Sequence, residues 1–227
     1  MLKGYEINDL AKEESWRMFQ IMGELVEGFD SLAGIEPAVT IYGSARLSTD
    51  DELYTQIEEI ANRLGQMGFS IITGGGPGVM EAANKGAFKA GVTSVGLNIE
   101  LPEEQSFNAY TTMSIMFNHF FVRKVMLVKY AAAFIIMPGG LGTLDELTEV
   151  LTLMQNHKIR PFPVVLFNDQ YWKGFLDWLQ SSVLAREFIS EYDLNLLRVC
   201  DHPDEVIETV HRWYTKQEIV GRKALLR

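Results

Sequence analysis

The chain has 227 residues, of which 47% are hydrophobic and 22% charged, as in a globular protein with one sizeable core. Its 30 acidic and 20 basic residues give a net charge of −10, which argues against a nucleic-acid polymer as partner. No apolar run reaches the roughly 18 residues of a membrane-spanning helix, and the first residues lack the apolar centre of a signal peptide. The single cysteine, Cys200, has no partner for a disulfide within these residues. We therefore expect a cytoplasmic protein with no membrane partner.

Short apolar runs alternate with longer amphipathic stretches along the chain. The apolar runs predict strands at residues 38–42, 68–73, 92–99, 109–115, 131–137 and 163–167. The amphipathic stretches predict helices at residues 8–29, 79–90, 118–130, 143–156, 171–182 and 203–214. One further helix is predicted between a capping box at Thr49-Asp50-Asp51-Glu52 and the glycines at positions 65 and 68. This alternation is typical of a parallel sheet with helices on both faces, so the predicted fold class is α/β.

The predicted organisation is one domain, because no repeat, long linker or Pro/Ser-rich boundary interrupts the pattern. Residues 37–167 hold the predicted sheet and form its core. Residues 1–36 are a helical extension at the N-terminus, and residues 168–227 supply the C-terminal helices. We expect the extension to pack on the sheet or on a partner subunit.

Three glycine-rich turns directly follow predicted strands, so they lie at the carboxyl edge of the sheet, where open α/β sheets bind ligands. The first turn contains Gly43 and Ser44, and the second runs from Gly74 to Gly78. Backbone N–H groups of such turns bind anions, and the candidate residues for this role are Ser44, Gly75, Gly76 and Gly78. The alternative is that these glycines serve only the geometry of tight turns.

The third turn, Pro138-Gly139-Gly140-Leu141-Gly142-Thr143-Leu144-Asp145-Glu146, follows an entirely apolar strand. Its glycines offer N–H groups and its threonine one hydroxyl to a phosphate; the residues concerned are Gly139, Gly140, Gly142 and Thr143. Glu146 then stands about 5 Å of helix rise beyond Thr143. A carboxylate near a phosphate suggests a chemical role. The alternative is a capping box, in which Glu146 only caps the N–H groups at the start of the helix.

Arg123 and Lys124 stand together inside a mostly apolar helix. Either they form a solvated stripe with surface salt bridges, or the arginine orients a ligand or pairs with Glu146. The periodicity alone leaves both interpretations open. The patterns of a dinucleotide site, a nucleotide P-loop and a zinc site do not occur, and we expect no metal and no cofactor.

Taken together, these residues resemble the LOG (Lonely Guy) family of nucleoside 5′-monophosphate phosphoribohydrolases, long labelled "lysine decarboxylase". The motifs of that family are an Arg-Lys pair and P-G-G-x-G-T-x-x-E, which here read Arg123-Lys124 and Pro138 to Glu146. The stretch from Gly74 to Ala87 and the turn Gly43-Ser44-Ala45-Arg46 also resemble bacterial members. The resemblance covers residues 38–167 and implies a Rossmann-like three-layer sandwich.

The resemblance further implies hydrolysis of AMP or cytokinin riboside 5′-monophosphates to free base and ribose 5-phosphate. It implies that Arg123 and Glu146 are catalytic, that the Gly-Thr turn binds the phosphate, and that the protein works as a homodimer or larger homo-oligomer. Lys124 joins the residues expected to contact the substrate. Breaking the bond between ribose and base builds positive charge on the sugar, which a carboxylate can stabilise while it activates water.

Glu81 is a candidate for protonating the leaving base, although a glutamate in a first helical turn is more often a partner of the helix dipole. Lysine decarboxylation would need pyridoxal phosphate on a lysine, and no lysine here has a recognisable context for it. One competing function is that of a non-catalytic nucleotide or molybdenum-cofactor binder with the same fold. A purely structural or interaction protein is the third possibility.

Overall fold

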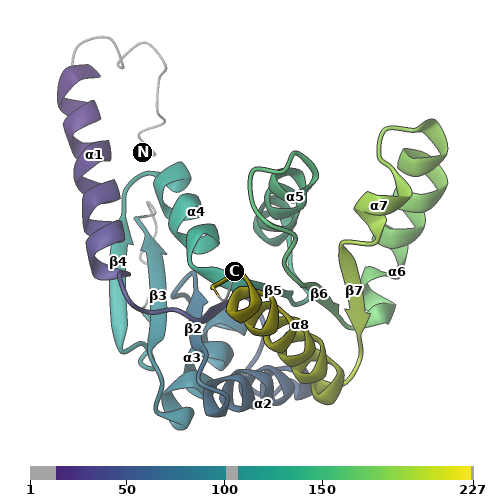
Figure 1. Cartoon of the computed structure of the whole chain (residues 1–227). Coiled ribbons are helices and arrows are strands. Elements are labelled where there is room, and N and C mark those ends of the chain that lie inside the picture. Colours follow the sequence, from purple (N-terminus) through teal and green to yellow (C-terminus); the bar gives the residue numbers. More distant parts are fainter. Residues whose placement is uncertain (1–13, 101–106, 226–227) are drawn as a thin grey trace.

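The computed structural model describes residues 14–100 and 107–225 of the chain (Figure 1). A seven-stranded sheet forms its centre, with the strand order β4-β3-β2-β1-β5-β6-β7 and parallel pairing throughout. The strands are β1 (Ala38–Tyr42), β2 (Ser70–Thr73), β3 (Ser94–Ile99), β4 (Met113–Phe117), β5 (Ala131–Ile136), β6 (Val164–Phe167) and β7 (Leu197–Cys200). The predicted α/β class with a parallel sheet is therefore confirmed.

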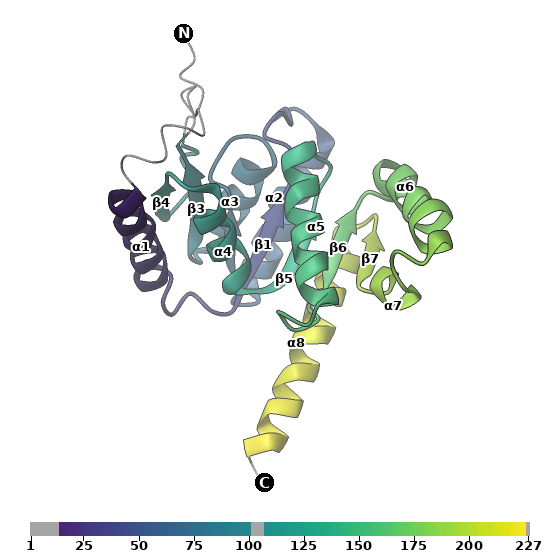
Figure 2. The ribbon, with the colours of Figure 1, turned by 90° about the horizontal axis from the view of Figure 1, so that it is seen from above.

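Helices cover both faces of this sheet, which gives the three layers seen in Figures 1 and 2. One face carries α1 (Glu14–Ser31), α4 (Phe120–Lys129), α5 (Leu141–Gln155) and α6 (Asp169–Trp178). The other face carries α2 (Glu52–Gln66), α3 (Val79–Ala90) and α8 (Pro203–Leu225). A short helix, α7 (Glu191–Leu194), leads into the edge strand β7.

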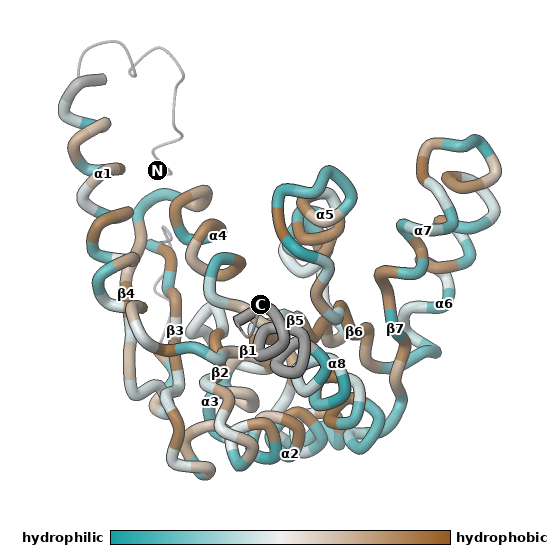
Figure 3. Tube along the Cα trace, in the orientation of Figure 1, coloured by the Kyte–Doolittle hydropathy of each residue, from teal (hydrophilic) through white to brown (hydrophobic). Residues whose placement is uncertain are grey.

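Each face has its own apolar core, and the strands divide their side chains between the two. Tyr42 of β1 packs into the core beneath α4 and α5, whereas Ile41 packs into the core beneath α2 and α3. This is the two-residue alternation expected of a strand with helices on both sides. Figure 3 shows the hydrophobic residues of the central strands in brown. In the part of the chain that the structure describes, no helix is long and apolar enough to cross a membrane.

Several predicted boundaries differ from the structure. The strand predicted at residues 109–115 forms at Met113–Phe117, and the helix predicted from 143 begins at Leu141. The strand β7 and the helix α7 were not predicted, because two of the four residues of β7 are exposed at the sheet edge and give no apolar run. The first helix is described from Glu14, and the predicted residues 8–13 lie outside the described residues.

The capping box predicted at Thr49-Asp50-Asp51-Glu52 is wrong. Asp51 is the N-cap of α2, and its carboxylate accepts a hydrogen bond from the Leu53 N–H at 2.9 Å. The carboxylate of Asp51 stands directly before the helix on extended backbone, so it reaches the first free N–H groups without Thr49.

Candidate active site

The order of the strands reverses at β1, because β2 to β4 lie on one side of it and β5 to β7 on the other. Ligands of open α/β sheets bind at the carboxyl edge beside such a reversal. In this protein the first and third glycine turns meet at the carboxyl edge beside β1. The Ser44 N–H donates to the Pro138 carbonyl at 3.1 Å, and the Met137 N–H donates to the Tyr42 carbonyl at 2.8 Å.

The second glycine turn joins the first at the start of α3. The Val79 N–H donates to the Ser44 carbonyl at 3.0 Å. Gly78 has a φ of +67°, and a Cβ at this position would come within 2.6 Å of the Ser44 carbonyl oxygen. Glycine is therefore required here by both the backbone conformation and the close approach of the two turns. The predicted convergence of the three turns at one edge is confirmed.

The helix α5 begins in a way that leaves its N-terminal N–H groups open. Its N-cap is Gly140, and no side chain of the described residues caps it. Thr143 is the third helical residue and only 4% exposed. A Cβ on Gly139 would lie 2.1 Å from the Thr143 hydroxyl, so the turn closes tightly around that side chain. Uncapped N–H groups at a helix start form an anion site.

The capping-box alternative for Thr143 and Glu146 is wrong. Glu146 lies in the second turn of α5, too far along the helix to cap its start, and its carboxylate faces Arg123 of α4. The Arg123 Nη2 donates to the Glu146 Oε1 at 3.2 Å. The two side chains are only 13% and 15% exposed, which also overturns the interpretation of Arg123 as part of a solvated stripe.

Burial makes Glu146 a much weaker acid than an ordinary glutamate. Its removal from water raises the pKa to about 7, although the charge and hydrogen bond of Arg123 work in the opposite direction. Asp145 adds to the increase in pKa, and Lys124 opposes it. A carboxyl group that titrates near neutral pH is suited to proton transfer at that pH.

The guanidinium of Arg123 also reaches the second glycine turn. A Cβ on Gly74 would stand 3.6 Å from the Arg123 Nη2. The Arg123 Nε is buried and has no hydrogen-bond partner within the described part of the chain. A buried donor without a partner is costly in an isolated protein, so this atom is available to an acceptor on a ligand.

The remaining predicted site residues have partners of their own. The Lys124 Nζ contacts the carboxylates of Asp145 at 2.9 Å and Glu149 at 3.4 Å, both on α5. Glu81 accepts a hydrogen bond from the Tyr54 hydroxyl at 3.0 Å. The Ser44 hydroxyl accepts one from the Arg46 N–H, also at 3.0 Å. The two contacts of Lys124 tie α4 to α5 beside the site.

A buried polar network behind the second glycine turn was missed by the sequence analysis. Asn84 of α3 is fully buried; it accepts from the Thr73 hydroxyl at 2.6 Å and donates to the Ser94 hydroxyl at 2.8 Å. Asn108 donates to the Gly76 carbonyl at 3.1 Å, and the Gly75 N–H donates to the Thr73 hydroxyl at 3.0 Å. The network therefore fixes the turn. The available signal was an asparagine on the apolar face of a helix.

Tyr171 of α6 holds the third turn from the opposite side and was also missed. Its hydroxyl donates to the Gly139 carbonyl at 2.5 Å. It stands 32 residues from its partner in the sequence, so no local pattern could have revealed the contact.

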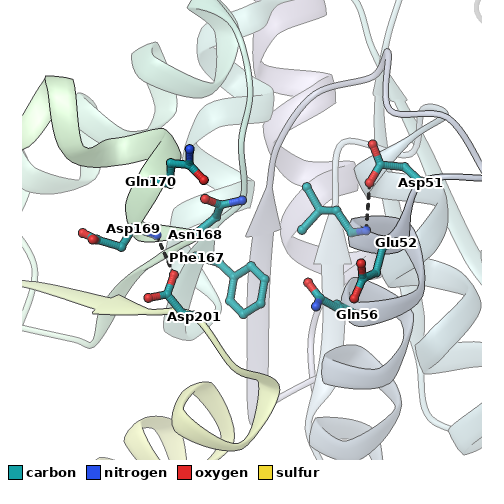
Figure 4. A pocket seen from close by; sticks show the side chains of 9 residues that line it. Asp51, Glu52, Gln56, Phe167, Asn168, Asp169, Gln170 and Asp201 are labelled. Atoms are coloured by element: carbon teal, nitrogen blue, oxygen red, sulfur yellow. Dashed lines mark hydrogen bonds between the residues drawn. The ribbon is translucent and has the colours of Figure 1, made fainter.

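A pocket of about 500 Å³ opens at the same edge of the sheet, beyond the site (Figure 4). It lies between the start of α2 and the ends of β6 and β7, and its acidic wall is unsuitable for a phosphate. The acidic residues are Asp51, Glu52, Asp169 and Asp201. A second pocket, of about 550 Å³, lies near the start of β5 at the opposite edge. No group of three or more potential metal ligands occurs among residues 14–100 and 107–225.

Named relatives of the chain include plant and bacterial proteins. It is 27% identical over 169 residues to the Arabidopsis thaliana cytokinin riboside 5′-monophosphate phosphoribohydrolase LOG1, covering 73% of this chain and 78% of that one. It is 33% identical over 102 residues to a probable enzyme of the same name from rice, LOGL6, covering 44% of this chain and 40% of that one. It is 30% identical over 144 residues to the Escherichia coli (strain K12) pyrimidine/purine nucleotide 5′-monophosphate nucleosidase, covering 56% of this chain and only 30% of that one.

Solved structures with the same fold include molybdenum-cofactor proteins. The molybdenum cofactor carrier protein of Chlamydomonas reinhardtii superposes with a TM-score of 0.58 at 20% identity, over 79% of this chain and 98% of that one. The molybdenum cofactor binding protein of Rippkaea orientalis superposes with a TM-score of 0.55 at 23% identity, over 77% and 94%. These similarities show the Rossmann-like fold. Residues 80–210 match the family described as "Possible lysine decarboxylase", so the chain belongs to this family, the LOG family.

Proposed function

We propose that the protein hydrolyses the N-glycosidic bond of a nucleoside 5′-monophosphate, either AMP or a cytokinin riboside 5′-monophosphate, and releases the free base and ribose 5-phosphate. The observation that carries this proposal is the buried pair of Arg123 and Glu146, 3.2 Å apart, beside the uncapped start of α5. The names of the plant and bacterial relatives support the same reaction class.

In this proposal the 5′-phosphate binds the start of α5. The N–H groups of Gly139, Gly140 and Gly142 and the hydroxyl of Thr143 supply the donors, and the helix dipole favours the negative charge. Ser44 and the glycines of the second turn, Gly75, Gly76 and Gly78, line the same edge of the sheet. Lys124 contributes positive charge beside it. Phosphate binding away from the reacting bond provides energy for placing the ribose against Glu146.

Glu146 acts in its ionised form. Its carboxylate stabilises the positive charge that develops on the ribose ring and accepts a proton from the attacking water. The water oxygen bonds to the anomeric carbon, the bond from that carbon to the base nitrogen breaks, and the base leaves with the electron pair. The base then takes up a proton, for which Glu81 is the candidate donor. Arg123 holds the carboxylate in place and favours its ionised form.

The competing function is non-catalytic binding of a nucleotide or molybdenum cofactor. The molybdenum-cofactor proteins with the same fold fit this alternative, but at 20–23% identity their similarity shows only the fold. A protein that only binds gains nothing from a buried carboxylate beside an anion site, because the negative charges repel each other. The pair of Arg123 and Glu146 therefore favours the hydrolase.

We further propose that the protein is a cytoplasmic homo-oligomer. Two neighbouring helices, α1 and α4, expose large apolar side chains: Trp16, Phe19, Met22, Val26, Phe121 and Val125. Figure 3 shows brown segments on both helices. Apolar surface of this kind is typical of contacts between subunits. Residues 37–167 would bind the nucleotide within one domain. Its N-terminal extension is residues 1–36, of which the helix α1 would form part of the contact.

The test is release of free base from AMP and from isopentenyladenosine monophosphate. Glu146→Gln keeps the size and the hydrogen-bonding oxygen of the side chain but removes the titratable group. We expect wild type to release base and this variant to lose at least about hundred-fold in kcat, as enzymes do when a key general base is removed. Glu59→Gln on α2, which removes a carboxylate 52% exposed to solvent, is the matched control. Equal turnover by wild type and Glu146→Gln would contradict the assignment.

A further inference from the structure

One buried carboxylate connects α1 to the helix that carries Arg123. Glu24 of α1 is only 8% exposed. Its Oε1 accepts from the Asn118 N–H at 3.2 Å, from the Asn118 Nδ2 at 3.0 Å and from the His119 Nδ1 at 3.0 Å. Its Oε2 accepts from the His119 N–H at 3.3 Å. A carboxylate that receives this many donors is tightly fixed.

These donors lie directly before α4. His119 is the N-cap of α4, and its own side chain makes no capping hydrogen bond with the described residues. Glu24 holds this N-cap residue and the preceding Asn118 through their N–H groups, and it brings a negative charge to the positive end of the helix dipole. Burial works to raise the pKa of Glu24, but the hydrogen bonds from Asn118 and His119 outweigh it and lower the pKa. Glu24 is therefore ionised at neutral pH.

Arg123 is one helical turn away from this contact. The His119 carbonyl accepts from the Arg123 N–H at 3.2 Å and from the Val122 N–H at 3.1 Å. The ring of Phe120 lies 5.8 Å from the guanidinium carbon of Arg123. A movement of the first turn of α4 would therefore move the backbone of Arg123, and with it the guanidinium that meets Glu146 at 3.2 Å.

We propose that Glu24 is a positioning residue, which fixes the first turn of α4 and thereby sets how Arg123 meets Glu146. The proposal rests on the hydrolase function proposed above. It makes α1, which lies alongside α4 in Figures 1 and 2, a working part of the site. The family match begins at residue 80, so α1 lies outside it. A shift of about 1 Å at a catalytic group is enough to lower a rate by about hundred-fold.

The contact is separate from the packing that holds α1 in place. Gly28 lies against Met126, where a Cβ would come within 2.8 Å of the Met126 Cε. The Tyr130 hydroxyl donates to the Phe29 carbonyl at 3.3 Å. Because these contacts join the C-terminal half of α1 to the far end of α4, loss of Glu24 should disturb the first turn of α4 without detaching α1.

The experiment compares Glu24→Gln with Glu27→Gln, an exposed glutamate on the same helix. For base release from AMP, we expect Glu24→Gln to lower kcat by about ten- to hundred-fold with little change in KM, and Glu27→Gln to behave as wild type. The acid limb of the pH–rate profile should also move in Glu24→Gln. A lowered melting temperature with unchanged kcat and unchanged pH profile would overturn the proposal, because it would show a merely structural contact.

A second readout does not depend on turnover. Carbon-13 labelling of the glutamate carboxyls allows the titration of Glu146 to be followed by NMR, with Glu146→Gln to assign the signal. We expect the midpoint to rise in Glu24→Gln and to stay unchanged in Glu27→Gln. If wild type releases no base, the proposed hydrolase function fails, and the NMR titration still decides whether Glu24 positions Arg123. An unchanged midpoint in Glu24→Gln would overturn the proposal.

Discussion

Removing the charge of Arg123 should displace the pH dependence of the reaction. Arg123→Met keeps a long side chain in the same place but removes the cation that lies 3.2 Å from the Glu146 carboxylate in wild type. A cation this close lowers the pKa of a carboxyl by about 1–3 units. Because the pKa of Glu146 is about 7 with Arg123 present, it should rise to about 8–10 without it.

The consequence for the rate follows from the fraction of Glu146 that is ionised. At pH 7 this fraction is about half in wild type and falls to between about a tenth and a thousandth in Arg123→Met. The acid limb of kcat/KM, which reports the free enzyme and is measured as base release from AMP between pH 5 and pH 10, should therefore move upward by about 1–3 pH units.

Lys124→Met is the matched control, because it removes a neighbouring cation that pairs with Asp145 and Glu149. It should move the limb less, since among the charged groups that act on Glu146 the effect of Lys124 is smaller than that of Arg123. If circular dichroism shows both proteins folded and the acid limb of Arg123→Met coincides with that of wild type, Arg123 does not control the ionisation of Glu146.

Four further predictions concern stability and binding. Glu146 binds its proton more tightly in the folded state than in the unfolded state. The free energy of unfolding of wild type, measured in urea, should therefore fall relative to that of Glu146→Gln by up to ~3 kcal/mol as the pH rises from 4.5 to about 7. Free energies of unfolding that change equally with pH in the two proteins would contradict this. Gly139→Ala places a Cβ 2.1 Å from the Thr143 hydroxyl and should lose about 1–3 kcal/mol in the same assay and raise KM for AMP; an unchanged KM would argue against phosphate binding at this turn. Asn84→Ala should lower the free energy of unfolding by about 1–3 kcal/mol, because it leaves the buried hydroxyls of Thr73 and Ser94 without their amide partner. A smaller loss would show that water replaces the amide. Tyr171→Phe should raise KM while lowering stability by only about 0.5–1.5 kcal/mol, and unaltered kinetics would show that its bond to Gly139 does not shape the turn.

The sheet and the glycine turns could be predicted because their signals are local. The strand at residues 131–137 is entirely apolar, and the turn that follows it is marked by three glycines within four residues. A parallel arrangement then brings such turns to one edge of the sheet without further information. The joining of Ser44 to Pro138 at 3.1 Å follows from that geometry.

The pairing of Arg123 with Glu146 could not be decided from the sequence. The Thr143-x-x-Glu146 spacing fits a capping box as well as a catalytic role, and only the start of α5 at Leu141 separates the two. Glu24 shows the same limit more strongly. On an amphipathic helix it looks like a solvent-facing residue, and its partners lie 94 and 95 residues further along the chain. Such contacts depend on tertiary packing, which the local pattern does not contain.

In the proposed reaction, Glu146 hydrolyses a nucleoside 5′-monophosphate that is bound at the start of α5. The most direct test is a single incubation with AMP in which adenine and ribose 5-phosphate are both quantified, with Glu146→Gln in parallel. We expect equal amounts of the two products from wild type and near-complete loss of both in the variant. If AMP raises the melting temperature of wild type but neither product forms from it or from isopentenyladenosine monophosphate, the protein is a nucleotide binder and not a hydrolase.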